Sequence, residues 1–225
     1  MIGVFDSGVG GICAFRELRR LMPREDIVYL ADRKNAPYGT KTKDEIIALT
    51  KADIKRLRTV GADKILIACC TASSVYDSLD EEERGISLPI IRPAAEKAAR
   101  VAKRIAVIAT ERTVASGAFS SELSRLTEAP VGELACQRLV ALVEGGCRDG
   151  RINAECEGEI NRIAELVWTL GADTLILGCT HFSHLERELQ KRCKVKTVSP
   201  AREGALALVK EIKNSRGENG RTIYM

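Results

Sequence analysis

The chain has 225 residues, of which 45% are hydrophobic and 29% charged, enough for one large or two small globular α/β units. Its 35 basic and 31 acidic residues leave a net charge of +4, and the densest basic stretch, Arg100–Arg104, has no interleaved aromatic residue to stack on a base. We therefore expect no nucleic-acid partner. We also expect no membrane association, because no apolar run has the length of a membrane helix.

The first expected strand, Ile2–Phe5, leads into the glycine-rich sequence FDSGVGG. This sequence is not a P-loop, since no Gly-Lys-Ser/Thr follows, and Cys13 replaces the third glycine of a dinucleotide-binding fingerprint. Glycines before a helix can still form a nest of N–H groups that suits a carboxylate. Asp6 and Ser7 have two interpretations, as polar groups of a binding cleft or as a simple helix cap.

Short runs rich in Val, Ile and Leu then alternate with helical patterns, which is typical of parallel βαβ units. The loop APYGTK (36–41) reads by itself as an ordinary turn, and clear helical patterns cover Lys43–Thr59 and Ile152–Leu170. The further expected strands are Ile27–Leu30, Lys64–Ala68, Pro89–Ile91, Ile105–Ala109, Thr174–Gly178, Val195–Val198 and Thr222–Tyr224. Their continuous apolar character predicts an α/β fold with sheets covered on both faces.

One part of the chain repeats another. Residues 61–69 read GADKILIAC and residues 171–179 read GADTLILGC, an offset of 179 − 69 = 110 residues. Downstream, LPIIRPAAEKAA (88–99) resembles VKTVSPAREGALA (195–207), and upstream IAVIAT (105–110) faintly resembles IGVFDS (2–7). Duplication explains these matches better than chance. Because ligands bind at the carboxyl ends of parallel strands, two facing copies would bring Cys69 and Cys179 to one cleft.

The chain has eight cysteines, which are not spaced as a disulfide framework. No secretory signal is visible at the start, so we expect reduced thiols and a cytoplasmic location. Cys69 and Cys179 each lie between a strand and a helix, where backbone N–H groups and the helix dipole favour a thiolate, and we interpret them as catalytic. Inert buried thiols are the interpretation for Cys13, Cys136, Cys147, Cys156 and Cys193.

The two histidines lie together in CTHFSHL, directly after the second repeat. Cys179, His181 and His184 could be drawn as a metal site, but zinc normally takes more ligands than this cluster offers, so we expect no metal. His181 is better placed to tune the Cys179 thiol or to carry its proton. We expect His184 to lie on a helix surface.

Taken together, the motifs resemble glutamate racemase, within the wider aspartate/glutamate racemase superfamily. The resemblance covers most of the chain and is carried, in order, by IGVFDSGVGG, PYGTKT, ACCTAS, ACQRLVALVEGG and LILGCTHF. It implies two pseudo-symmetric, doubly wound α/β domains with parallel sheets and an active site in the cleft between them. It also implies racemisation of a small acidic amino acid without pyridoxal phosphate or any other cofactor.

The resemblance assigns roles to individual residues. It implies that Cys69 and Cys179 are the two bases, that Asp6 assists the first and that His181 assists the second. Glu144 matches a glutamate that lines the cleft. The positions implied to bind the substrate are Ser7, Pro37, Tyr38, Gly39, Cys70, Thr71 and Thr180.

Several residues depart from the family pattern. Cys70 stands where the family has an asparagine that binds substrate, and a thiol is a much weaker hydrogen-bonding group than an amide. Gln137 stands where a proline is usual, Pro93-Ala94-Ala95 replaces Pro-Gly-Ala, and Ser199-Pro200 replaces an acidic-Ser pair. These changes leave both thiols in place and bear on the choice of substrate.

We therefore predict a two-domain protein, the first domain comprising residues 1–92 and 202–225 and the second residues 93–201. The predicted function is interconversion of L- and D-glutamate, which in the family supplies D-glutamate for peptidoglycan. Two alternatives stay open: a racemase for aspartate or another acidic substrate, and a catalytically weak homologue that binds a ligand or a protein. The sequence also leaves open whether the protein is a homodimer.

Overall fold

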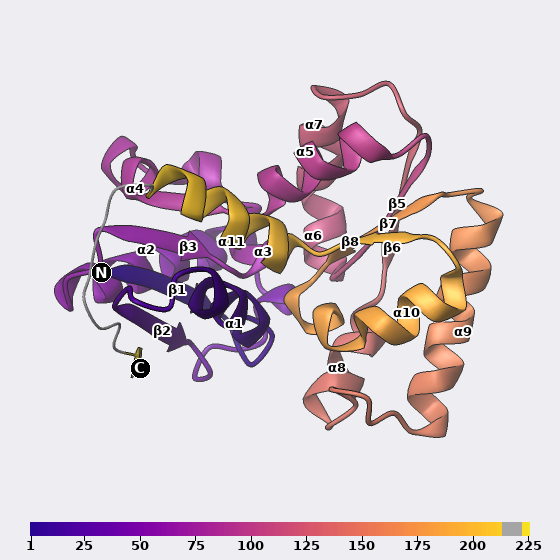
Figure 1. The fold of residues 1–225 in the computed structure, drawn as a ribbon, viewed down its shortest axis with the longest axis horizontal. Coiled ribbons are helices and arrows are strands. Elements are labelled where there is room, and N and C mark those ends of the chain that lie inside the picture. Colours follow the sequence, from indigo (N-terminus) through magenta and orange to yellow (C-terminus); the bar gives the residue numbers. More distant parts are fainter. Residues whose placement is uncertain (213–221) are drawn as a thin grey trace.

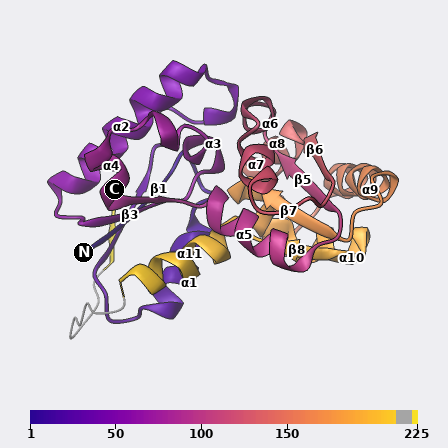
Figure 2. The same ribbon diagram turned by 90° about the horizontal axis from the view of Figure 1, so that it is seen from above.

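The structure is a computed structural model that describes residues 1–212 and 222–225. It contains two parallel β-sheets that lie side by side, each with helices packed against it (Figures 1 and 2). The first sheet has the strand order β4-β3-β1-β2-β9 and the second has the order β6-β5-β7-β8. The α/β fold with parallel sheets is therefore confirmed.

The elements of the first sheet and its helices come mainly from the N-terminal part of the chain. They are β1 (Ile2–Asp6), α1 (Ile12–Leu21), β2 (Ile27–Ala31), η1 (Tyr38–Thr40), α2 (Lys43–Thr59), β3 (Lys64–Ile67), α3 (Cys70–Ser73), η2 (Tyr76–Ser78), α4 (Glu81–Ile86) and β4 (Ser87–Pro89). The chain returns to this sheet at its other end, through α11 (Pro200–Glu211) and β9 (Thr222–Tyr224).

The second sheet uses the middle of the chain. Its elements are α5 (Ile91–Val101), β5 (Ile105–Ala109), α6 (Glu111–Ser116), α7 (Ala118–Ser124), β6 (Val131–Ala135), α8 (Gln137–Glu144), α9 (Ala154–Thr169), β7 (Thr174–Gly178), η3 (Thr180–Leu185), α10 (Glu186–Cys193) and β8 (Lys196–Val198). The strands of the two sheets thus come from residues 2–89 with 222–224, and from residues 105–198. The domain boundaries given above stay a prediction.

The internal repeat of the sequence reappears in the strand order. Without β9, the first sheet reads β2-β1-β3-β4, and the second reads β6-β5-β7-β8 with each strand in the equivalent place. The two GAD sequences lead into β3 and β7, so Cys69 and Cys179 follow equivalent strands. This correspondence supports the duplication inferred from the sequence.

The strands are buried on both faces because their side chains alternate between two layers of helices. In β1, Val4 packs in the apolar cluster that includes α1 and α11, whereas Phe5 packs in the cluster that includes α2. In β5, Val107 faces the side of α5 and α7, and Ile108 faces α8 and α9. Continuous apolar strands are thus the pattern that a sheet covered on both faces requires.

Most expected elements occur where the sequence places them. The expected helix Lys43–Thr59 matches α2, which begins with a capping box in which Thr42 and Glu45 bond each other's backbone N–H. The expected strand Pro89–Ile91 is wrong: the strand spans Ser87–Pro89, and α5 already begins at Ile91. Pro93 lies in the first turn of α5, where a helix needs no N–H from that residue, so the helix can start before it.

Helix α11 joins the two halves of the molecule. It packs against α1 and against α5 and lies along the first sheet in Figure 1. Gly204 allows close packing, because a Cβ at this position would lie 2.5 Å from Cγ2 of Ile90. Within residues 1–212 and 222–225, none of the helices combines the length and the apolar character that crossing a bilayer requires.

Candidate active site

The structure brings Cys69 and Cys179 into one pocket between the two sheets. Cys69 follows β3 and is 4% exposed, and Cys179 follows β7 and is 6% exposed. In Figure 2, α3 and α6 approach each other at this junction. The pocket is lined by Ser7, Pro37, Tyr38, Gly39, Cys69, Cys70, Thr71, Thr110, Gln137, Val140, Cys179, Thr180 and His181.

This pocket is almost closed. Its free volume is about 20 Å³, which is room for about one water molecule. An amino acid with a charged side chain needs far more space, so the residues around the pocket must move to admit one. A closed site of this kind excludes water from the groups that would handle a proton.

The surroundings of Cys69 favour its neutral thiol. Sγ lies 3.5 Å from Oγ of Ser7 and accepts the backbone N–H of Ala72 at 3.5 Å. Burial raises the pKa of Cys69 to about 12, and the negative charge of Asp6 adds to the increase. The backbone N–H of Ala72 lowers this pKa, as expected at the start of a helix, but burial has the larger effect, and α3 has only four residues.

Asp6 is close enough to this thiol for its charge to act on it, and it is completely buried. Its carboxylate accepts the N–H of Gly8 at 2.9 Å and the hydroxyl of Thr180 at 3.1 Å, so it holds the first half of the chain to the second. The alternative interpretation of Asp6 as a helix cap is wrong, since α1 begins at Ile12 and has no side-chain cap. Among the described residues no hydrogen bond joins Asp6 to Cys69, so Asp6 acts on that sulfur through its charge.

The surroundings of Cys179 are different. Its Sγ lies 3.5 Å from Nδ1 of His181, and Nε2 of His181 lies 2.5 Å from a carboxylate oxygen of Glu144. Burial opposes charge on the ring, but the interactions with Cys179 and Glu144 outweigh it and raise the pKa of His181 well above its usual value. In return, the hydrogen bond from His181 lowers the pKa of Glu144. An imidazolium beside Cys179 stabilises negative charge on that sulfur.

The glycine-rich loop after β1 packs directly against this second group. A Cβ on Gly10 would overlap the hydroxyl of Thr180, and one on Gly8 would lie 3.2 Å from Oε1 of Glu144. The glycines therefore allow the loop to approach η3 and α8 closely. A nest for a carboxylate was the expected role of these glycines, and this contact was not expected.

The other predicted binding residues also gather at the pocket. Ser7, Pro37, Tyr38, Gly39, Cys70, Thr71 and Thr180 line it, whereas Glu144 reaches it through His181. The Thr71 hydroxyl lies 3.2 Å from Oγ1 of Thr110 and 3.1 Å from Oγ1 of Thr113. This network connects α3 of the first half with α6 of the second.

Tyr38 is held by two carboxyl groups outside the pocket. Its hydroxyl lies 2.7 Å from Oδ2 of Asp32 and 3.0 Å from Oδ2 of Asp53. One hydroxyl hydrogen cannot fully serve both acceptors. Burial, followed by the charge of Asp32, raises the pKa of Asp53 to about 6, although Arg56 lies 3.1 Å away. The carboxyl group of Asp53 therefore takes up a proton at a higher pH than an exposed aspartate does.

The substitution Asp53→Asn should flatten the pH dependence of stability between pH 4 and pH 6. In the wild type, the folded state keeps a proton that the unfolded state loses near pH 3.8, so the free energy of unfolding falls as the pH rises to about 6. A shift of this size corresponds to about 3 kcal/mol. Urea denaturation at several pH values measures it, and Asp44→Asn, an exposed change on the same helix, is the control. An unchanged slope in Asp53→Asn would contradict the assignment.

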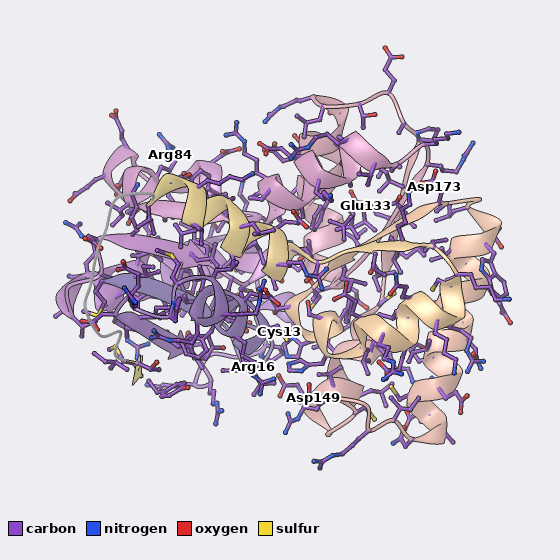
Figure 3. The ribbon with its side chains drawn as sticks, in the orientation of Figure 1. Cys13, Arg16, Arg84, Glu133, Asp149 and Asp173 are labelled. Atoms are coloured by element: carbon purple, nitrogen blue, oxygen red, sulfur yellow. The ribbon has the colours of Figure 1, made fainter. Side chains whose placement is uncertain are left out.

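The expected position of His184 on a helix surface is wrong. It is 7% exposed, its Nε2 lies 3.7 Å from Sγ of Cys13, and its Nδ1 lies 3.1 Å from Oδ1 of Asp149. In Figure 3, Cys13 and Asp149 lie where the two halves meet. Neither residue lines the pocket of the two thiols. The apolar pattern around His184 gave no sign of these partners, which come from distant parts of the chain.

Cys179, His181 and His184 do not form a metal site together, because His181 contacts Cys179 whereas His184 contacts Asp149. Within the part of the chain that the structure describes, no three His, Cys, Asp or Glu side chains are grouped as metal ligands. All eight cysteines are free thiols.

Three pocket residues were not predicted as site residues. They are Thr110, Gln137 and Val140. Thr110 follows β5 as Ser7 follows β1, so the repeat of IAVIAT and IGVFDS was a signal for it. Gln137 was noted only as a departure from the family.

The molecule thus combines two parallel sheets of equivalent strand order with one pocket that both Cys69 and Cys179 line. A sequence profile of the Asp/Glu/Hydantoin racemase family matches residues 14–208, and the chain belongs to this family of isomerases.

Within the family, the chain is similar to glutamate racemases. It is 35% identical to the glutamate racemase of Persephonella marina, over 100% of this chain and 87% of that protein. The crystal structure of a glutamate racemase from Bacillus anthracis matches with a TM-score of 0.89 at 28% identity, covering 100% of this chain and 87% of the other. The glutamate racemase of Francisella tularensis in complex with D-glutamate also has a TM-score of 0.89, at 27% identity, covering 99% and 86%. The chain thus belongs with the glutamate racemases.

Proposed function

We propose that this protein interconverts L- and D-glutamate, with Cys69 and Cys179 acting as bases on opposite faces of the substrate. The observation that carries the proposal is the presence, in one buried pocket, of two thiols that follow equivalent strands of the repeat. Glutamate as the substrate is supported by the relatives, which are named glutamate racemases, and by the Francisella structure, which contains D-glutamate.

In one direction, the Cys179 thiolate removes the α-proton of the bound amino acid. The C–H bond breaks, an S–H bond forms, and the electron pair passes into the α-carboxylate. The Cys69 thiol then gives its proton to the opposite face and is left as a thiolate. The other enantiomer follows the same steps in reverse, starting from that thiolate. Hydroxyl groups such as those of Ser7 and Thr71 donate to the carboxylate as it gains charge.

The unequal surroundings of the two thiols support this scheme, because it needs one thiol and one thiolate at the start. Burial and the charge of Asp6 favour the neutral thiol of Cys69, whereas Cys179 lies beside His181, whose pKa is raised. The high pKa of Cys69 also makes its thiolate a strong base when the reaction runs from that side. The scheme requires no cofactor.

A substrate panel in deuterated water tests the proposal. Purified protein is incubated with each enantiomer of glutamate and aspartate, and deuterium at the α-carbon is followed together with optical rotation. Glutamate should gain deuterium and lose optical activity. If only aspartate reacts, the aspartate alternative, which Cys70 favours, replaces the proposal. If no acidic amino acid reacts, the protein is a binding homologue.

The substitution Cys70→Asn should raise glutamate racemisation by roughly tenfold, the factor for about 1.4 kcal/mol. Cys70 lines the pocket and is 2% exposed, and burial raises its pKa well above the usual value, so it offers the substrate a neutral, weakly bonding thiol. An amide would hold a carboxylate oxygen better, and part of that contact should strengthen in the transition state. The measurement is kcat/KM for both glutamate enantiomers under reducing conditions.

Cys70→Ala is the matched control, because it removes the thiol without adding an amide and should give no gain. A Cys70→Asn protein that melts at the wild-type temperature and shows no gain on glutamate would count against glutamate as the substrate. It would leave the two-thiol reaction untouched.

We further propose that the enzyme works in the cytoplasm, where it supplies D-glutamate for peptidoglycan. The family resemblance and the eight free thiols support this role.

A further inference from the structure

The side chain of Gln137 ends in the pocket without a partner. Gln137 is the first residue of α8, and its Oε1 is shielded from solvent and has no hydrogen-bond partner among the described residues. A buried amide oxygen left unpaired costs about 1–3 kcal/mol. Because Gln137 lines the same pocket as the two thiols, a molecule bound there can reach this amide.

Gln137 lies in a particular corner of the pocket. A Cβ on Gly39 would lie 3.2 Å from Oε1 of Gln137 and 3.0 Å from Cβ of Thr110, so these three residues are close neighbours. The hydrogen bonds of the two thiols run to Ser7, to the N–H of Ala72 and to His181, and none reaches this corner. The corner therefore holds none of the hydrogen-bond partners of the thiols, and we assign it to the side chain of the substrate.

The charge of the pocket determines what this amide can do. None of the residues that line the pocket is lysine or arginine, so a carboxylate must be held by neutral donors or by His181. The terminal NH₂ of a glutamine supplies two donors, and a half-turn of the amide exchanges the places of Nε2 and Oε1. A side-chain carboxylate in the corner would select the orientation in which Nε2 points toward it.

We propose that Gln137 determines specificity by donating hydrogen bonds from its amide to the side-chain carboxylate of the substrate. This inference rests on the proposed racemisation of an acidic amino acid. Gln137 takes no part in proton transfer at the α-carbon. Its contact exists equally in the ground state and the transition state, so its loss should raise KM and leave kcat nearly unchanged.

Two substitutions of similar size test the donor. Gln137→Leu removes it and should raise the KM for glutamate by about 10- to 100-fold, the range for a hydrogen bond to a charged group. Gln137→Glu replaces it with a carboxylate that repels the substrate, and should raise KM further while improving the ratio of glutamine to glutamate turnover. Gln190→Leu changes the only other glutamine, exposed on α10, and should leave both constants unchanged.

The readouts are KM and kcat for both enantiomers, with the melting temperature as the check on folding. Gln137→Asn, which keeps the amide but shortens the side chain, should fold and give an intermediate KM. An unchanged KM in a folded Gln137→Leu protein, or a lowered KM in Gln137→Glu, would overturn the inference. The wild-type exchange experiment judges the proposed function separately, because it does not depend on Gln137.

Discussion

Replacing either Cys69 or Cys179 with alanine should reduce racemisation by at least about 10³-fold, within the range by which a positioned acid–base group accelerates proton transfer. Racemisation needs a proton removed on one face and delivered on the other, and in the proposed scheme each sulfur serves one face only. The remaining thiol cannot complete the inversion. The measurement is loss of optical rotation with each glutamate enantiomer, at protein concentrations high enough to detect a residual rate.

Deuterium exchange should distinguish the two variants. Each retains a base for one enantiomer, so Cys69→Ala should exchange the α-proton of one enantiomer with retention, and Cys179→Ala that of the other. Cys136→Ala and Cys193→Ala are matched controls, since these thiols are 1% and 0% exposed but lie outside the pocket. Racemisation near the wild-type rate in either pocket variant would rule out the two-base scheme.

His181→Asn should lower kcat/KM by about 100-fold, because the Cys179 thiolate loses the charged group beside it. The fall must be equal for both enantiomers, since they have equal free energy in water.

Glu144→Gln should lower kcat/KM less than His181→Asn does, and it should shift the pH profile of kcat/KM in one direction. Glu144 helps to raise the pKa of His181, so its removal lowers that pKa. Activity that depends on protonated His181 disappears as the pH rises through this pKa, and the alkaline limb should move to lower pH.

Asp149→Asn is the matched control for this experiment. Asp149 pairs with His184 much as Glu144 pairs with His181, but it lies outside the pocket of the two thiols. It should leave the pH profile of kcat/KM unchanged. If Glu144→Gln left the alkaline limb in place, or moved it to higher pH, His181 would not be the group that stabilises the thiolate of Cys179.

The sequence predicted the fold well where a pattern was both apolar and repeated. β3 and β7 follow the two GAD sequences, and α2 follows from a regular pattern with a capping box. β6 was missed because Val131–Ala135 is an edge strand of mixed polarity that contains Gly132 and Glu133. A half-exposed edge strand lacks the continuous apolar run that identifies the central ones.

The sequence predicted those pocket residues that lie in the repeat or in the family motifs. The pairing of Glu144 with His181 joins residues 37 positions apart, and that of Cys13 with His184 joins residues 171 apart. No local pattern encodes such contacts. The unpaired amide of Gln137 was also beyond the sequence, since burial of a single atom depends on the closed packing of both halves.

The return of the chain through α11 and β9 affects the order in which the protein can be completed during synthesis. Domains tend to fold as they leave the ribosome, N-terminal parts first. The first sheet cannot be completed in this way, because β9 pairs with β2 only after the whole second sheet has been made. Until then β2 is an open edge, and α1 lacks the helix that packs against it. The nascent chain therefore carries an incomplete first half until α11 and β9 have been made.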